Sequence, residues 1–427
     1  MTDSAAETGR VLASAVASER LRIVATLIRH SGDWDLAEDC FQDAVQRALT
    51  VWPEHGIPDN PGAWLTTVAK NLAIDALRRA STERRTGTRY ARELEIDEEE
   101  RQAMTTPPDP EDDVLDDDRL RLIFTCCHPA LAMEARVALT LRTVIGLSVA
   151  ETAHVFLTTE PTMQKRLVRA RAKIRDAGIP YRVPPAGLLA ERVDGVLAVL
   201  YLVFTEGYSS GGGVEYLRTP LAEEAIRLTR LVVTLMRDLP QHPEALSLLA
   251  LELFQQSRAE TRLDAAGDLV LLDEQDRTRW NRAMIVEGTA MLDEARRSGG
   301  AGAYELQAQI AQHHATAPTP GATDFAAIAD LYERLAQLTP SPVVLLNRAV
   351  AVAFAQGLDA GLALLDDLDG DERLATYHLL PATRADLLRR RGDVDAALPH
   401  YLRARDLAPS DAERRFLTRR IDELGRT

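Results

Sequence analysis

The stretch SVAETAHVFLTTEPTMQKRLVRARAKIR, from Ser148 to Arg175, contains two helix starts. Ser148 and Glu151 have the spacing of a capping box, in which each side chain bonds to the other residue's backbone N–H. A second start follows, with Thr159 as the expected N-cap and Pro161 in the first turn. The stretch therefore predicts two helices that meet at a short turn.

The second of these helices has an apolar face and a basic face. Its apolar residues recur at spacings of four, three and four, which is typical of a buried stripe: Met163, Leu167, Ala170 and Ile174. In a recognition helix, polar side chains near the N-terminus reach base edges and later cations contact phosphates. A solvated basic face on a structural helix is the alternative, but cap, turn length and charge together favour a helix-turn-helix. The residues expected to contact DNA are Thr162, Gln164, Lys165, Arg166, Arg169 and Lys173.

Three further helical patterns precede this module, at about residues 20–30, 35–50 and 64–79. In DWDLAEDCFQDAVQRAL, residues 33–49, an apolar stripe leaves acidic and amide side chains on the other face. Such a face suits contacts with a helix of a partner protein. An ordinary solvated acidic face would give the same pattern.

The segment PGAWLTTVAKNLAIDALRR, residues 61–79, also has one apolar and one polar face. The polar face suits single-stranded DNA, because its cations can follow the backbone of a displaced strand. Trp64, at the start of this helix, is interpreted as a core anchor rather than a base-stacking residue. The outward-facing residues are Thr67, Lys70, Asn71, Asp75, Arg78 and Arg79.

These segments resemble conserved regions of the sigma-70 family of RNA polymerase sigma factors. GLSVAETAHVFLTTEPTMQKRLVRARAKIR is similar to the fourth region, which reads the minus-thirty-five promoter element, and departs from its pattern at Leu157 and Pro161. Residues 33–49 resemble the region-two helix that grips the polymerase clamp helices. Residues 61–79 resemble the helix that reads the minus-ten element.

The resemblance implies that core RNA polymerase and promoter DNA are the partners of this chain. The basic helix would contact the minus-thirty-five element, and the outward face of residues 61–79 would contact the minus-ten element. The loop at residues 53–62 corresponds to one that receives a flipped minus-ten base in this family. Polymerase contacts are expected at Asp35, Leu36, Glu38, Asp39 and Gln42.

From about residue 187 onward nearly all of the sequence has helical periodicity. Residues 392–409 follow the pattern GDxDxAxxxYxxAxxLxP, which is typical of the second half of a tetratricopeptide repeat, and residues 381–391 supply its partner helix. A weaker copy at residues 346–368 indicates helix pairs that stack, since one pair cannot bury its own apolar face.

The segments LIFTCCHPAL, YLVFTEGY, LDEQDRTRW and SPVVLLNRAVAVA resemble a subgroup of extracytoplasmic-function sigma factors with a fused tetratricopeptide-like extension. The resemblance implies that this extension regulates or supports transcription. Its concave surface would suit a peptide, a protein helix or the chain's own sigma modules. A stabilising appendage is the alternative.

We therefore predict an all-α chain with two small sigma modules and a helical-repeat domain. Residues 97–100 (DEEE) and 105–113 (TTPPDPEDD) indicate a disordered acidic linker between the modules. The expected segments are region two at 1–92, the linker at 93–118, region four with its helix-turn-helix at 119–182, a helical extension at 183–300 and tetratricopeptide-like repeats at 301–427.

Composition argues against several other classes of protein. A net charge of -15 disfavours non-specific coating of nucleic acid. Cys40, Cys126 and Cys127 are too few for a disulfide framework or a zinc cluster, so they are interpreted as structural. Because neither a signal peptide nor a long apolar window is present, a cytoplasmic location without membrane contact is expected.

Enzymatic signals are weak. His313 and His314 lack ligand-spaced carboxylates, and the GGG at residues 211–213 lacks the Lys-Ser/Thr of a phosphate loop. We expect no catalytic residues, no metal and no cofactor. A sigma factor needs none, because the polymerase makes the phosphodiester bond.

The main alternative is a one-component regulator, with a helix-turn-helix that binds operators and a helical sensor domain. Such a regulator has no need of the two helices at residues 33–49 and 61–79, and it should dimerise to match operator half-sites. A tetratricopeptide scaffold without a DNA role would leave the basic helix unexplained.

Overall fold

A computed structural model of the chain describes residues 2–87, 118–156, 158–179, 181–184, 186–208, 219–300 and 302–425. Across these ranges the regular structure is helical, and the only β-type pairing is an isolated bridge between Leu263 and Leu269. The all-α prediction is therefore confirmed. The chain forms two compact units, Met1–Val199 and Leu200–Thr427, each of which is described by itself.

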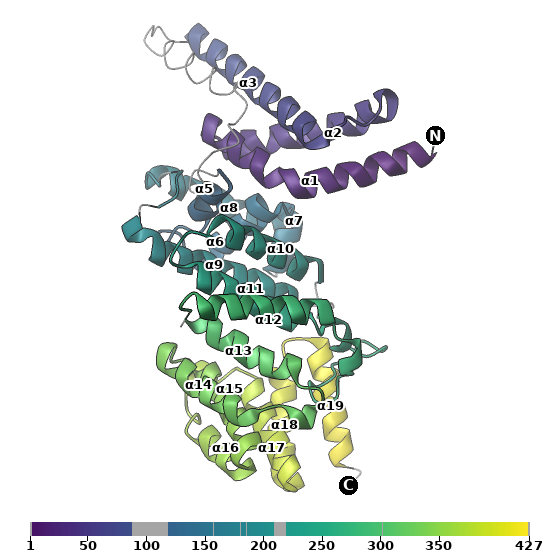
Figure 1. Cartoon of the computed structure of the whole chain (residues 1–427), viewed down its shortest axis with the longest axis vertical. Coiled ribbons are helices and arrows are strands. Elements are labelled where there is room, and N and C mark those ends of the chain that lie inside the picture. Colours follow the sequence, from purple (N-terminus) through teal and green to yellow (C-terminus); the bar gives the residue numbers. More distant parts are fainter. Residues whose placement is uncertain are drawn as a thin grey trace. The chain divides into compact units, whose positions relative to one another are not determined.

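The first unit begins with three helices that pack against one another: α1 (Thr2–Ser31), α2 (Trp34–His55) and α3 (Pro61–Gly87) (Figure 1). Asp33 caps α2, because its carboxylate accepts hydrogen bonds from the backbone N–H groups of Asp35 and Leu36. Gly56 ends the same helix at a φ of 90°, a conformation that favours glycine. Phe41 and Trp52 lie in the core between the helices. All three helical patterns expected before the linker are present.

The next helices of this unit are short: α5 (Asp118–Cys126), α6 (Met133–Leu139), the π-helix η2 (Thr140–Ile145), α7 (Val149–Val155) and α8 (Glu160–Asp176). Gly146 ends η2 in the left-handed region, with a φ of 97°. The long helix α9 (Ala186–Tyr208) follows and contains the point at which the two units divide. The predicted acidic linker lies outside the described residues apart from Asp118, which begins α5.

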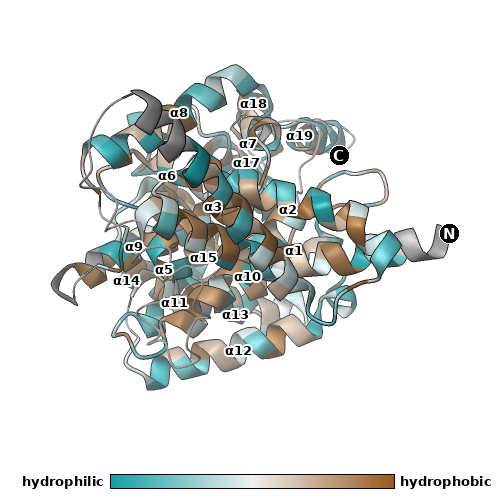
Figure 2. Ribbon diagram, turned by 90° about the horizontal axis from the view of Figure 1, so that it is seen from above, coloured by the Kyte–Doolittle hydropathy of each residue, from teal (hydrophilic) through white to brown (hydrophobic). Residues whose placement is uncertain are grey.

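The second unit is a succession of helices in which chain neighbours pack together, as Figure 1 shows for α17 and α18. Figure 2 shows hydrophobic and hydrophilic bands alternating along α12, as expected of a helix with one buried face. The helices are α10 (Thr219–Leu235), α11 (His242–Gln256), α12 (Arg282–Arg297), α13 (Ala303–Thr316), α14 (Phe325–Leu338), α15 (Pro342–Gln356), α16 (Leu358–Asp366), α17 (Leu379–Arg391), α18 (Val394–Leu407) and α19 (Asp411–Leu424). Short 3-10 turns lie at Ala259–Thr261, Arg277–Arg279, Pro320–Ala322 and Glu372–Leu374.

The helix pair predicted at residues 381–407 is present as α17 and α18. Gly392 ends α17 in the left-handed region, and the pattern residues Ala397, Tyr401 and Ala404 are buried. The weaker copy corresponds to α15 and α16, which also pack together. The helices are as expected, whereas their assignment to the tetratricopeptide family stays a prediction.

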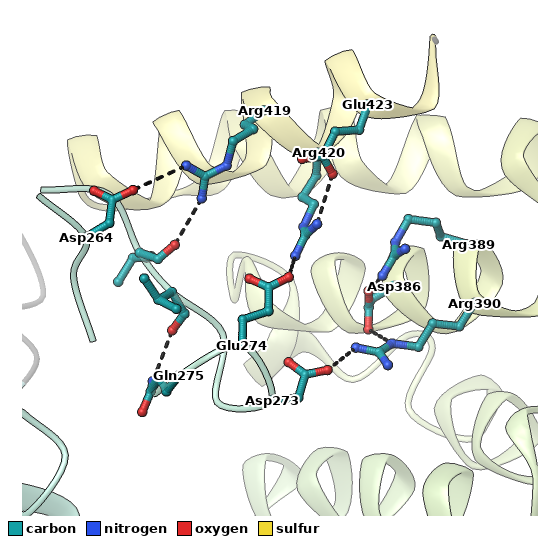
Figure 3. A network of polar contacts seen from close by, with 12 residues as sticks. Asp264, Asp273, Glu274, Gln275, Asp386, Arg389, Arg390, Arg419, Arg420 and Glu423 are labelled. Carbon is teal, nitrogen blue, oxygen red and sulfur yellow. Dashed lines mark hydrogen bonds and ion pairs between the residues drawn. The ribbon is translucent and has the colours of Figure 1, made fainter. Parts of the chain in front are cut away.

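A network of ion pairs ties the segment at residues 264–275 to α17 and α19 (Figure 3). Arg390 pairs with Asp273 at 2.8 Å, Arg419 pairs with Asp268 at 3.2 Å, and Arg420 pairs with Glu274. Because this segment has almost no regular structure of its own, arginines on the two helices fix its path across the unit.

Candidate polymerase and promoter-DNA interface

The helix-turn-helix is built as the sequence predicts. Ser148 N–H donates to the Glu151 carboxylate at 2.7 Å, and Glu151 N–H donates to the Ser148 hydroxyl at 3.0 Å, so the capping box before α7 is complete. On α8 the predicted stripe is the buried set, namely Met163, Leu167, Ala170 and Ile174. Leu157, where the chain departs from the family pattern, lies outside the described residues.

Thr159 differs in detail from the expectation. It is the N-cap residue of α8, with Pro161 in the first turn, but its side chain makes no capping bond to the backbone. Its hydroxyl instead lies 2.8 Å from that of Thr162. The first turn of α8 therefore depends on Pro161 and on backbone bonds from Thr162 and Met163 to the Thr159 carbonyl.

The polar face of α8 is open to solvent. Of the six residues expected to contact DNA, only Arg166 is half-buried, and its guanidinium lies 5.0 Å from the centre of the Phe156 ring. A shallow hollow of about 420 Å³ runs beside this face, between α8 and the start of α6. Five of the six residues line it together with small apolar side chains: Thr162, Lys165, Arg166, Arg169 and Lys173. Gln164 is exposed beside them.

The polar face of α3 is also exposed, with one exception. Thr67, Asn71, Arg78 and Arg79 are exposed, as is Asp75, whose carboxylate lies 3.9 Å from the Arg78 guanidinium. Lys70 is half-buried, and burial together with the nearby Arg29 and Arg22 lowers the pKa of its amine. Arg29 and Arg22 of α1 thus lie near Lys70, each of them paired with a carboxylate, Arg29 with Asp118 and Arg22 with Glu19.

The two tryptophans beside the loop at residues 56–60 pack against each other. Trp52 is buried, and the ring centres of Trp52 and Trp64 lie 5.4 Å apart in an edge-to-face arrangement. Trp64 therefore has the contacts of a core anchor, as the sequence suggests.

On α2, four of the five residues expected to contact polymerase are accessible. Asp35, Asp39 and Gln42 are exposed and Leu36 is half-buried. Glu38 was expected on the polar face, but it is buried, with 5% of its surface exposed. Its carboxylate lies among guanidinium groups of Arg20, Arg142 and Arg171. The helical pattern of one segment could not reveal this, because two of the three arginines come from residues more than 100 positions away.

All three cysteines are buried and unpaired by disulfide bonds. Burial raises the pKa of the Cys40 thiol to about 11 and that of Cys127 to about 12. The Cys127 sulfur lies 3.7 Å from the Thr140 hydroxyl. These surroundings disfavour the reactive thiolate and suit the structural role that we expected.

Within the described ranges, no three His, Cys, Asp or Glu side chains gather as a metal site would require.

Burial among arginines lowers the pKa of His314 to about 4. Over the described residues, no helix has the length and apolar content needed to cross a membrane.

Replacing Ser148 by alanine should lower the free energy of unfolding by about 1 kcal/mol. The substitution removes the hydroxyl that accepts from the Glu151 N–H, and the bond from the residue 148 N–H to the Glu151 carboxylate is then held less firmly. Hydrogen bonds from the Ser148 backbone and hydroxyl hold the pKa of Glu151 below its ordinary value. The stability that the ionised Glu151 carboxylate contributes is fully present above its pKa in the unfolded chain. It is lost as the pH falls through the lower pKa of Glu151 in the folded chain. The difference between wild type and variant should therefore shrink in acid.

Denaturant unfolding of the full chain at several pH values checks this prediction. Thr159→Ala is the matched control, since the Thr159 side chain makes no capping bond to the backbone. If both substitutions lower the free energy of unfolding by the same amount, the capping box of Ser148 and Glu151 does not stabilise α7 as the structure indicates.

Family models match three parts of the chain: sigma-70 region 2 at residues 15–83, sigma-70 region 4 at residues 121–174, and a family of unknown function, DUF6596, at residues 192–296. The first two matches fall on α1 to α3 and on α5 to α8. The third match starts in α9 and runs through α12. This part of the helical extension therefore matches a separate family, whose function is unknown.

Two relatives in sequence give further evidence of the family to which the chain belongs. An uncharacterized protein of Rhizobium meliloti (strain 1021) is 43% identical over 415 residues, which covers 96% of this chain and 95% of that protein. A probable ECF RNA polymerase sigma factor, SigI, of Mycobacterium tuberculosis is 31% identical over 169 residues, which covers 40% of this chain and 56% of that protein. No solved structure matches the chain. With both sigma regions in order and a relative of this kind, the chain belongs to the sigma-70 family as an extracytoplasmic-function sigma factor with a C-terminal helical extension.

Proposed function

We propose that this protein binds core RNA polymerase, recognises minus-thirty-five and minus-ten promoter elements, melts the promoter and initiates transcription. The exposed polar face of α8, with Arg169 and Lys173 beyond a complete capping box, is the observation that carries the proposal. It has the layout of a helix that enters the major groove. The exposed cations of α3 suit the backbone of a displaced single strand.

In this proposal each surface has one partner. The polar residues of α2, including Asp39 and Gln42, contact the polymerase clamp helices, while α3 and α8 contact DNA. The helical extension regulates this activity as a tetratricopeptide-like domain. The protein works where the polymerase works, in the cytoplasm, without a cofactor or a catalytic step of its own.

Promoter-selective transcription in vitro tests the proposal. Purified full-length chain is added to bacterial core polymerase with a template that carries the upstream region of its own gene, and melting is followed with a probe of unpaired thymine. We expect discrete transcripts and melting only when chain and core polymerase are both present.

The one-component regulator makes the opposite prediction. A regulator would bind duplex DNA tightly by itself and as a dimer, and it would not support initiation by core polymerase. Core-independent, dimeric binding with no transcripts would replace the sigma-factor proposal.

A further inference from the structure

A buried ion-pair cluster joins region two to region four within the first unit. We name it the Glu38 cluster, and it consists of Arg20, Asp35, Glu38, Arg142 and Arg171. Glu38 on α2 pairs with Arg142 of η2 and has a guanidinium nitrogen of Arg171 on α8 at 3.6 Å. Arg171 also pairs with Asp35. The side chains of Arg142, Arg171 and Glu38 are only 21%, 15% and 6% exposed, so the two pairs of Glu38 are not solvated surface pairs, whereas the Asp35 side chain is 76% exposed.

Arg20 on α1 completes the cluster by binding the end of η2. Its guanidinium donates hydrogen bonds to the carbonyls of Thr143 at 2.7 Å and Arg142 at 3.2 Å, and it lies 3.9 Å from Glu38. Gly146 makes room for it, since a Cβ there would lie 2.7 Å from the Arg20 guanidinium carbon. The end of region four's π-helix is thus shaped around a region-two side chain.

Two further contacts support the same arrangement nearer the C-terminal end of α1. The Tyr181 hydroxyl, after α8, donates to the carbonyl of Ala25 at 2.9 Å. Arg29 on α1 pairs with Asp118 of α5 at 3.1 Å. Helix α1 therefore makes several polar contacts with the segment from α5 to Tyr181, all of them between Arg20 and Arg29.

From this geometry we infer that the Glu38 cluster is an intramolecular lock, in which region four covers part of the polymerase-binding surface of α2. The inference rests on the proposed function, which assigns polymerase contacts to Asp35 and Glu38. Arg142 and Arg171 hold the Glu38 carboxylate in a buried cluster, and Arg171 also pairs with Asp35, whose side chain stays exposed like those of Asp39 and Gln42. Core polymerase must therefore displace region four to engage the whole surface.

The lock leaves the DNA-reading face of region four uncovered. Arg171 points to region two, while Arg169 and Lys173 on the same helix are exposed. The closed form thus restricts polymerase binding rather than contact of α8 with DNA. The hydrogen-bonding capacity of the Glu38 cluster is not fully satisfied. Oε1 of Glu38 is buried and accepts no hydrogen bond from the described residues. A polymerase surface that offers better partners can compete with it.

The test measures the affinity of the full chain for core polymerase. Arg171→Gln and Arg20→Gln each remove a cation of the cluster and leave the carboxylates of α2 and the DNA-facing residues of α8 in place. If the closed form predominates about tenfold, releasing it should tighten apparent binding by up to about tenfold. Arg175→Gln is the matched control, since Arg175 lies one turn further along α8, is 78% exposed and pairs only with the adjacent Asp176 among the pairs that the structure shows.

A second measurement tests the cluster in the free chain. Glu38→Gln and Arg171→Gln should each lower the midpoint of the thermal transition of the first unit. The double variant should lower it by less than the sum of the two single shifts, because the two side chains share one interaction. Additive shifts would mean that the cluster does not form in solution, and would overturn the inference even in a chain that binds polymerase.

The outcomes separate the inference from the proposed function. If wild type binds core polymerase and the Arg171 and Arg20 variants bind no tighter, the lock is wrong and the sigma-factor proposal stands. If neither wild type nor any variant binds core polymerase, the proposed function fails and the lock fails with it. Tighter binding by both variants, with Arg175→Gln unchanged, is the expected result.

Discussion

Replacing Arg169 by glutamate should weaken recognition of a minus-thirty-five element by about 100-fold. Loss of one cation from a base or phosphate contact costs about 1–3 kcal/mol, and each 1.4 kcal/mol is about tenfold. The carboxylate of the introduced glutamate would also face the DNA phosphates. Its repulsion from them should bring the loss of binding free energy to the upper end of the range of about 1–3 kcal/mol. Arg169 is exposed, so the fold should not change.

The measurement is binding of the polymerase complex to two promoter fragments, one with the minus-thirty-five element intact and one with it scrambled. Wild type should prefer the intact fragment, and Arg169→Glu should bind both about equally. Arg175→Glu is the control, because Arg175 is exposed on the same helix but lies outside the predicted contact set. An equal loss for both variants would point to general charge rather than to a role of Arg169 in recognition.

Helix α8 shows how much a local pattern can establish. Met163, Leu167, Ala170 and Ile174 were predicted as the buried stripe from their spacing alone, and they are the buried residues of α8. The spacing of Ser148 and Glu151 likewise predicted two hydrogen bonds that are both present. These features depend on residues within one or two turns, so sequence spacing contains the information needed.

The Glu38 cluster shows what such a pattern omits. On a helical projection of α2 alone Glu38 belongs to the polar face, and only contacts with Arg142 and Arg171 show that this part of the face is buried. Nothing in the spacing of residues 33–49 indicates which distant cations approach. Burial of a charge depends on tertiary pairing, whereas burial of an apolar stripe follows from the stripe itself.

The extension illustrates the same limit on a larger scale. Helical periodicity predicted its helices, and α17 and α18 occupy the predicted positions. The segment around Asp273 and Glu274 has no periodicity, and arginines of α17 and α19 hold it in place (Figure 3). An exposed Arg or Asp in sequence gives no sign of its partner more than 100 residues away.

Gly361→Ala should lower the free energy of unfolding of the second unit by about 2 kcal/mol, which is an overpacking cost of about 3 kcal/mol less the gain in helix propensity. An alanine Cβ at this position of α16 would lie 2.3 Å from the Cβ of Ala353 and 2.7 Å from the carbonyl oxygen of Ala349, both on α15. The backbone carbonyl cannot move without disturbing α15. Helix propensity alone would favour alanine by about 1 kcal/mol, so the two effects have opposite signs.

Thermal unfolding of the full chain, followed by calorimetry, measures the change. Gly321→Ala is the matched control, because a Cβ there has nothing within 4 Å and its φ is not in the left-handed region. A loss of about 2 kcal/mol should lower the midpoint of the second unit by roughly 4–8 °C. If Gly361→Ala is instead neutral or stabilising, α15 and α16 are not packed as closely as the structure has them. The stacking of helix pairs that the sequence predicts would then need another basis, because close approach at Gly361 is what lets α16 bury Leu362 and Leu365 against its neighbours.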